Sequence, residues 1–446
     1  MGLAETRAKA LGKSQAAVCL ARGDVEECFR LVLEHGISPY SQSAIQMRAM
    51  LFMRKSNFEE AQKLTDTCWV MGKDPISAKM RGDILFLQQK FAESEVAYRE
   101  ALALTPDSPD VLHDLGVAIV SQGRTRECLS YFDRAIQLMP ERAEFHHHYA
   151  IMLLLDGQTE AGWDRMQSRL AVPGVTGSFP YPDKYWKGED LKDKVIVIRS
   201  EQGWGDTIMF ARYFPWFTQR AKKVYFYGQR AILSLIHAHY PDVVCWPNDA
   251  PVPMDFDYHV NLMCFPRLCG LDVPAPQPKK EKGKGIGVCW FGSPTHKADK
   301  LRSVPIERFA PLAEAIDDSL LSLGWGFFWK LENNVAVGDN KPDFVEYCLN
   351  ERQDWLETAE FVKNLELVIT VDTAIAHLAG FLGVECWLLL PYVPDFRWGM
   401  SGETTPWYPS MRLYRQPKLM DWDSVFERVQ SDLEKRFAPS LEAQAA

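Results

Sequence analysis

The sequence predicts an α-helical solenoid followed by an α/β region made of two Rossmann-type halves, the first of them shortened. Three observations support this fold class. Small, aromatic and proline residues recur every 34 positions in the first third of the chain. From about residue 193, apolar strand-like runs alternate with helical patterns, which is typical of parallel sheets covered on both faces. A polar, proline-rich segment at 274–285 divides this second region in two.

The repeats are the clearest long-range pattern. A spacing of 34 residues separates Gly82 from Gly116, Tyr98 from Phe132, Ala101 from Ala135, and Pro106 from Pro140. Glycine lets two antiparallel helices approach, the aromatic ring fills the space between them, and proline ends the second helix. These residues match the tetratricopeptide pattern, and looser copies extend the predicted array over residues 1–170.

An array of this kind forms a concave groove. We therefore expect the groove to bind a protein or peptide. The alternative is that the helices only scaffold the next domain or hold a homo-oligomer together. Beyond the array, we expect a linker at 171–192, a first α/β half at 193–275, a second at 284–437 and a disordered tail at 438–446.

One strand-to-helix corner carries a predicted anion site. The β-branched run 367–371 stops at Asp372, and a small-residue helical pattern begins with Thr373 and Ala374. The first turn of such a helix offers unpaired N–H groups and the positive end of its dipole, which suit a diphosphate. His377 lies one turn further on and is expected to reach the same ligand. The alternative is an ordinary corner in which Asp372 or Thr373 caps the helix.

Two further strand ends carry polar groups. After the strand at 194–199, Glu201, Gly203, Gly205 and Asp206 form a glycine-rich turn that leads into a helix. Asp206 is either a helix cap or a carboxylate at the end of a strand, where open α/β sheets bind ligands. The strand at 285–290 is followed by a polar loop with His296, Lys297, Lys300 and Arg302. Three such loops together predict a ligand cleft between the two halves.

Composition narrows the class of protein. The 446 residues carry a net charge of −9, which argues against a broad nucleic-acid interface. The longest apolar runs are too short for a transmembrane segment. The ten cysteines are scattered without a Cys-x-x-Cys pair, which favours reduced thiols and a cytoplasmic location. His146, His147 and His148 are adjacent on a predicted helix and point in different directions, so we expect no metal there.

Residues 193–437 resemble the heptosyltransferase-like glycosyltransferases (glycosyltransferase family 9) of the GT-B fold. The resemblance rests on the Gly-Asp turn at 205–206, the Gly-x-Pro-x-His-Lys loop at 292–297 and the Val-Asp-Thr-x-x-Ala-His-Leu-Ala corner at 371–379. The chain also resembles bacterial proteins that join tetratricopeptide repeats to such a domain, some of which glycosylate flagellin or other proteins. Their counterparts here are Pro391–Trp398 and Pro406–Pro409 with Arg412, Arg415 and Gln416. The stretch Gly162–Arg169 also resembles the Gly-Trp…Arg ending that precedes their transferase domain. The chain departs from the family in its short first half and at 323–334, where relatives carry a Ser-Leu-Gln-like segment near the nucleotide.

The resemblance implies an enzyme that moves a sugar from a nucleotide-sugar donor to an acceptor hydroxyl on a protein held by the repeats. It implies an inverting reaction that needs neither a metal nor a cofactor, with Asp206 as the base. Lys297, Lys300 and Arg302 are expected to balance the diphosphate together with the N–H groups of Thr373 and Ala374, while Arg397 lines the cleft. Two alternatives stay open: a non-catalytic adaptor with a degenerate domain, and a transferase that acts on a saccharide or lipopolysaccharide.

Overall fold

A computed structural model describes residues 25–34, 38–177, 179–252, 255–271, 274–279, 283–293, 296, 299–316, 320–323, 343–347 and 354–437. Lys297 and most of the segment 323–334 therefore lie outside the described residues, as does the tail at 438–446. The chain divides into two compact units, one ending at Met152 and the other beginning at Leu153.

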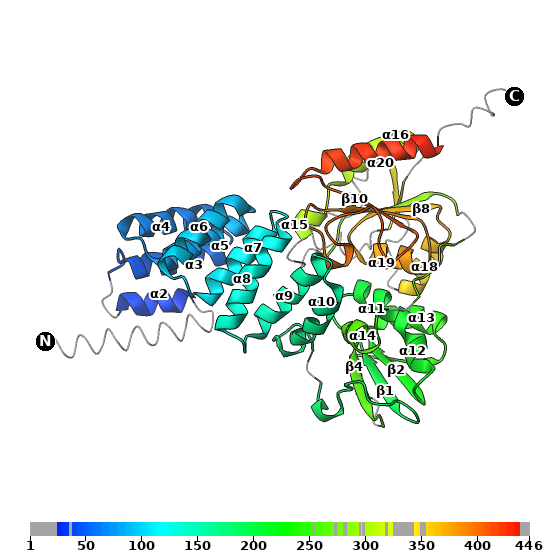
Figure 1. Ribbon diagram of the computed structural model, residues 1–446. Helices are drawn as coiled ribbons and strands as arrows, with labels where there is room; N and C mark the ends of the chain where they lie inside the picture. The colour runs from blue at the N-terminus through cyan, green and yellow to red at the C-terminus, as the bar shows by residue number, and fades with distance from the viewer. Residues whose placement is uncertain are drawn as a thin grey trace. The chain divides into compact units, whose positions relative to one another are not determined.

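The first unit is built from successive helices that pack on their neighbours in the chain (Figure 1). Ser41, Asn57 and Asp74 accept hydrogen bonds from backbone N–H groups at the starts of the second to fourth described helices, which fixes where those helices begin. The helices are α2 (Val25–Glu34), α3 (Gln42–Arg54), α4 (Phe58–Met71), α5 (Pro75–Leu87), α6 (Phe91–Leu104), α7 (Pro109–Val120), α8 (Thr125–Leu138) and α9 (Ala143–Leu155), the last of which continues into the second unit.

The residues that recur every 34 positions lie where the helices of a pair touch. A Cβ atom added to Gly82 would lie 2.5 Å from the Tyr98 ring, and one added to Gly116 would lie 3.0 Å from the Phe132 ring. Since ordinary carbon contacts are longer than this, only glycine lets α5 approach α6 this closely. The predicted helical solenoid is confirmed for this part of the chain.

The second unit contains two parallel sheets among its described residues. The smaller has the order β3-β2-β1-β4. Its strands are β1 (Val195–Arg199), β2 (Lys223–Gly228), β3 (Val243–Pro247) and β4 (Tyr258–Asn261), and its helices are α11 (Trp204–Phe210), α12 (Phe214–Thr218), α13 (Arg230–His239) and α14 (Phe265–Leu268). The linker also packs on this sheet: Phe179 lies 4.4 Å from the His259 ring, and the Trp186 N–H donates to the His259 carbonyl oxygen at 2.9 Å. A linker segment thus lies beside β4, where Tyr185 forms a parallel β-bridge with His259.

The larger sheet has the order β10-β9-β8-β5-β6-β7, with all strands parallel. Read from its other edge, this is the doubly wound order in which the first strand lies beside the fourth. The strands are β5 (Ile286–Cys289), β6 (Leu320–Ser322), β7 (Val345–Tyr347), β8 (Leu367–Val371), β9 (Cys386–Leu390) and β10 (Met411–Arg415). The helices of this half are α15 (Asp299–Arg302), α16 (Ala310–Ile316), α18 (Trp355–Lys363), α19 (Ala374–Phe381) and α20 (Trp422–Phe437). No pattern recognised in the sequence predicted β7, β10 or α20.

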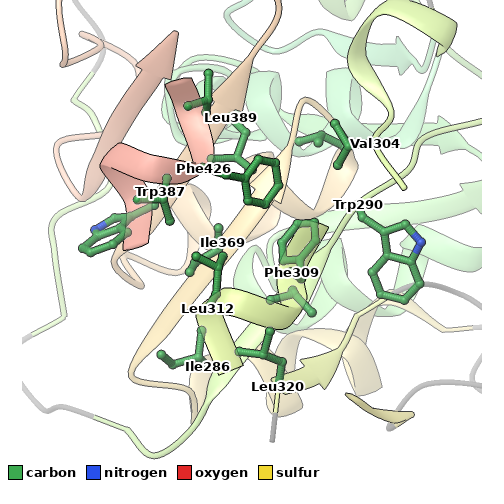
Figure 2. Close-up of a cluster of buried hydrophobic side chains, with 14 of the residues drawn as sticks. Ile286, Trp290, Val304, Phe309, Leu312, Leu320, Ile369, Trp387, Leu389 and Phe426 are labelled. Atoms are coloured by element: carbon green, nitrogen blue, oxygen red, sulfur yellow. The ribbon is translucent and has the colours of Figure 1, made fainter. Parts of the chain in front are cut away.

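Helices cover both faces of the larger sheet, with α16 and α20 on one side and α18 and α19 on the other (Figure 1). Figure 2 shows the first of these layers, in which Ile286, Ile369 and Leu389 from three strands meet Leu312 and Phe426 from the two helices. Burial on both sides is why these strands read as continuous apolar runs. The α/β prediction for this region is confirmed.

Short 3-10 helices complete the second unit, and three of them position the groups described below. They are η1 (Met166–Ala171), η4 (Leu262–Cys264) and η6 (Phe396–Trp398). The short helix α10 (Thr159–Arg165) precedes η1. Its Trp163 is buried and packs edge-on against Phe210, Phe396 and Trp407. One residue near the start of this unit therefore contacts both α/β halves.

Candidate functional site

The larger sheet has one point where a crevice is expected. Strands β5 and β8 are neighbours. The strand that follows β5 in the chain, β6, lies on one side of this pair, and the strand that follows β8, β9, lies on the other side. The connections that follow β5 and β8 therefore leave in opposite directions, and ligands of open α/β sheets bind at this switch point. The loop after β5 carries His296 and Arg302, and the turn after β8 carries Asp372 and Thr373. The structure thus brings two of the three predicted corners together.

The turn after β8 opens α19. Thr373 is its N-cap, with extended backbone angles, and its Oγ1 accepts a hydrogen bond from the Ile375 N–H at 3.3 Å. Asp372, Thr373 and Ala374 are partly exposed, whereas the helix becomes buried from Ile375 onward. The positive end of the helix dipole is therefore accessible at Thr373 and Ala374.

Arg302 joins the two loops at this point. Its Nη1 donates to the backbone carbonyl oxygen of Asp372 at 2.8 Å, and its Nε lies 3.3 Å from Asp299 Oδ1. A Cβ atom added to Gly292 would lie 2.3 Å from Arg302 Nη2, so the guanidinium lies directly against this glycine and a larger residue would displace it. The arrangement places a positive charge beside the start of α19. Lys300 is exposed on the same short helix.

His296 lies on the same loop and responds to the same charges. Desolvation lowers its pKa first, Arg302 lowers it further, and Asp395 opposes them. Part of the residue stays open to solvent. The loop after β5 is therefore electrostatically linked to the segment that carries Asp395.

Asp206 lies in the first turn of α11, at the end of the smaller sheet. Its Oδ2 accepts a hydrogen bond from the Gly203 N–H at 3.0 Å, so the capping alternative of the sequence analysis holds for one oxygen. Its Oδ1 accepts from Arg397 Nη2, and Arg397 Nη1 also donates to Asp395 Oδ1 at 2.7 Å. The side chains of Asp206 and Arg397 are only 14% and 9% exposed. Burial raises the pKa of Asp206, and the positive charge of Arg397 opposes that rise.

The corner that carries Asp206 is next to the corner that carries Thr373. A Cβ atom added to Gly205 would lie 3.4 Å from Ala374 Cα and 2.8 Å from His377 Cδ2. Helices α11 and α19 therefore pack directly on one another at Gly205, and no open channel separates them at that point. This contact explains the second glycine of the turn.

His377 occupies this helix contact. Its imidazole is buried, Nδ1 lies 3.0 Å from the Tyr408 hydroxyl, and the ring stacks on Trp398 at 5.3 Å. Burial holds its pKa well below the ordinary value, and Arg397 adds to the effect, so the ring is neutral. His377 therefore lies among aromatic rings and not at the exposed start of α19. Gly205 packs against the imidazole edge at Cδ2, so a ligand cannot reach that edge. The role of His377 as a ligand contact stays a prediction.

Glu201 is held in a buried ion pair. Arg169 of η1 donates to its two carboxylate oxygens at 3.0 and 2.7 Å, and the Met263 N–H donates to Oε1 at 2.7 Å. The Arg169 side chain is fully buried and that of Glu201 is 1% exposed. Since Glu201 follows β1 and Met263 follows β4, this ion pair fills the switch point of the smaller sheet. The grouping of Glu201 with ligand-facing residues is therefore corrected.

Sequence reasoning missed Asp395, Tyr408, Asp299 and Arg169 as members of these networks. Asp395 and Tyr408 fall inside the two motifs that follow β9, so their place in the chain carried some signal. Arg169 ends the Gly-Trp…Arg stretch at 162–169, but nothing local indicated its partner, which lies 32 residues away. Among the described residues, no group of three or more histidine, cysteine, aspartate or glutamate side chains is arranged to hold a metal ion.

Comparison with known proteins agrees with the first unit. A family model described as TPR repeat matches residues 82–123. The chain contains tetratricopeptide repeats. Solved structures with similar helical regions include PilF of Pseudomonas aeruginosa, at 18% identity, covering 37% of this chain and 82% of that one with a TM-score of 0.33. Another is YrrB, described as a TPR protein with an unusual peptide-binding site, at 13% identity, covering 35% and 82% with a TM-score of 0.29.

Two curated proteins are also similar. Protein FlbA of Caulobacter vibrioides is 24% identical over 397 residues, which cover 78% of this chain and 65% of that protein. Protein O-mannosyl-transferase Tmtc2 of Drosophila melanogaster is 35% identical over 78 residues, which cover 17% of this chain and 8% of that protein. The chain thus spans less than two thirds of the length of either relative. Within the described residues, no helix has the length and apolar character needed to cross a membrane.

Proposed function

We propose that the chain is a glycosyltransferase that moves a sugar from a nucleotide-sugar donor to an acceptor hydroxyl. The observation that carries this proposal is the juxtaposition of an accessible helix start and Arg302, at the switch point of a doubly wound sheet, with the carboxylate of Asp206 from the other half. The name of Tmtc2, a protein O-mannosyl-transferase similar over 78 residues, agrees with this class. We further propose that the two halves form a GT-B pair.

The proposed reaction is a single displacement. The donor diphosphate lies at Thr373 and Ala374, where helix N–H groups, Arg302 and Lys300 balance its charge, with Lys297 proposed beside them. Asp206 accepts the proton of the acceptor hydroxyl while that oxygen attacks the anomeric carbon. The bond to the diphosphate oxygen breaks on the opposite face, so the configuration at the anomeric carbon inverts. The charge of the leaving diphosphate stays on groups already in place, which is how such sites lower a barrier.

The acceptor is proposed to be a protein held by the tetratricopeptide repeats, which commonly bind polypeptide segments. The scattered cysteines fit our proposal of a cytoplasmic location.

The test is the substitution Asp206→Asn, which keeps the size of the side chain and its hydrogen bond to Gly203 but removes the base. We expect transfer to fall by about 100-fold or more, because a positioned base contributes on that scale. Transfer would be measured with radiolabelled nucleotide sugars and cell lysate as the source of acceptor. Asp249→Asn is the matched control, because Asp249 pairs with Arg230 on the surface, 2.7 Å away. An Asp206→Asn variant that transfers at the wild-type rate would show that the assigned base is wrong.

A second candidate is a non-catalytic adaptor with a degenerate transferase domain. It is favoured by the filled switch point of the smaller sheet, where Arg169 and Glu201 leave no room for a ligand. Thermal shift against a panel of nucleotide sugars separates the two, since stabilisation by one nucleotide class supports the enzyme. A saccharide or lipopolysaccharide acceptor is the remaining alternative. Removal of the first unit would abolish transfer to a protein but spare transfer to a small sugar.

A further inference from the structure

We propose that Arg397 is a positioning residue that passes from Asp206 to the diphosphate of the donor, so that donor binding itself releases the base. This inference rests on the proposed function and adds an order to it: donor first, then base. It starts from a plain difficulty in the site. A carboxylate held by a buried guanidinium is a weak proton acceptor, yet the proposed reaction requires Asp206 to accept a proton.

Arg397 is held on the second half but is paired with the first. Asp395 caps η6 by accepting from the Arg397 N–H at 3.0 Å, and it also accepts from Nη1. Phe396 packs against Trp163, and Trp398 stacks on His377, which fixes the residues on either side of Arg397. The backbone is therefore anchored, and the contact to Asp206 depends on the side chain alone.

The guanidinium has a donor to spare. Arg397 Nε is buried and has no hydrogen-bond partner within the described part of the chain. Buried polar groups in folded proteins are nearly always paired, so this donor is available for a further acceptor beside the proposed anion site. A planar guanidinium that offers a second edge suits the paired oxygens of a phosphate.

The charges around Arg397 link both corners. The carboxylates of Asp395, Asp206 and Asp372 all act on it, and Asp372 directly precedes the start of α19. A diphosphate bound at α19 adds negative charge on that side and competes with Asp206 for the same cation. Once Arg397 has moved, only the hydrogen bond from Gly203 still opposes the burial that raises the pKa of Asp206, and the carboxylate becomes a stronger base.

Competition for one cation makes a testable prediction about binding. UDP, GDP, ADP and dTDP would be titrated in turn into the full-length chain by calorimetry, and the tightest would be used throughout. We expect Asp206→Asn to tighten its binding by about tenfold, because a neutral amide no longer competes for the guanidinium. In an Arg397→Gln background, the same Asp206→Asn change should alter binding by less than twofold. Arg397→Lys should restore part of the gain.

The double-mutant cycle of Asp206→Asn and Arg397→Gln separates competition for Arg397 from a direct effect of the Asp206 charge on nucleotide binding. If removing the negative charge of Asp206 helps by itself, the gain persists in the Arg397→Gln background, and the inference is overturned. The surface pair Arg230 and Asp249 provides the matched control cycle, in which we expect no coupling. If the Arg397→Gln variant does not fold, the effect of Asp206→Asn on nucleotide binding is compared between the Arg397→Lys background and the wild-type background. A smaller gain with lysine still shows that the gain depends on this side chain.

A second readout concerns the proton. With saturating donor, the apparent pKa of the base in the rate profile should be higher than in the free enzyme, and Arg397→Gln should remove that difference. Nucleotide binding without coupling and without this difference would overturn the role of Arg397 and leave the proposed function standing. Failure of all four nucleotides to bind any variant would overturn both.

Discussion

Asp372 illustrates how a single carboxyl group is set by its surroundings. Burial raises its pKa to about 6, and the negative charge of Asp395 adds to the effect, whereas Arg302 and Arg397 oppose it. The backbone oxygen of the same residue is held by Arg302. Asp372 is therefore a group whose ionised form the fold tolerates poorly, beside a helix start that favours anions.

This raised pKa predicts a pH-dependent stability. Because the folded-state pKa lies above the ordinary value of 3.8, the favourable contribution of the protonated carboxyl is full below pH 4 and is lost as the pH rises through 6. Asp372→Asn should therefore stabilise the protein relative to wild type, by up to about 3 kcal/mol at pH 7 and much less at pH 4. Denaturant unfolding of both proteins at several pH values measures the difference. A difference that does not change with pH would contradict the assignment.

At the scale of elements, the contact between paired helices is set by glycine. Gly82 and Gly116 are equivalent positions, but the ring of Tyr98 is closer to the first than that of Phe132 is to the second. The pair α5 and α6 therefore tolerates an added methyl group less well than the pair α7 and α8.

We expect Gly82→Ala to destabilise the first unit by about 1 to 3 kcal/mol, since overpacking outweighs the better helix propensity of alanine. Gly116→Ala should cost clearly less, because its Cβ contact is 3.0 Å instead of 2.5 Å. Gly72→Ala is the control, with its nearest neighbour 3.7 Å away. Thermal unfolding followed by circular dichroism ranks the three variants. Equal effects at Gly82 and Gly116 would show that ring distance does not decide the cost.

At the scale of the whole chain, the division into units does not fall where the repeat pattern ends. The pattern predicts a boundary at 170, whereas the contacts divide after Met152. Trp163 and Arg169 lie between these points and are buried against the α/β halves. The last stretch of the predicted array is thus part of the packing of the second unit.

Truncation tests this division. A fragment that begins at 153 keeps Arg169, whereas one that begins at 171 leaves Glu201 buried without its partner. We expect the shorter fragment to be less stable by about 3 to 5 kcal/mol, the usual cost of removing one member of a buried ion pair. Denaturant unfolding compares the fragments, and Arg169→Met in the longer fragment should reproduce most of the loss. Equal stability of the two would assign the ion pair no structural role.

The sequence by itself determined most of the elements and their order, but not β7, β10 or α20. The 34-residue period fixed the helix pairs, because each glycine must meet its own aromatic ring at a constant separation along the chain. Alternating apolar runs fixed the parallel sheets, since burial on both faces leaves no polar period to read. The glycine-rich turn and the corner at Asp372 and Thr373 could also be predicted, because the backbone conformation of each depends only on residues next to one another in the chain.

Only the tertiary structure decided which side chains face one another. Arg169 and Glu201 form a pair, Arg397 holds Asp206, and Gly205 lies against His377 through contacts between segments far apart in the chain. Such pairings depend on how helices and sheets pack, and no local spacing encodes them. For this reason the sequence grouped Glu201 with the cleft residues, although Arg169 binds its carboxylate in the interior. For the same reason the role of Asp395 became apparent only from its contact with Arg397.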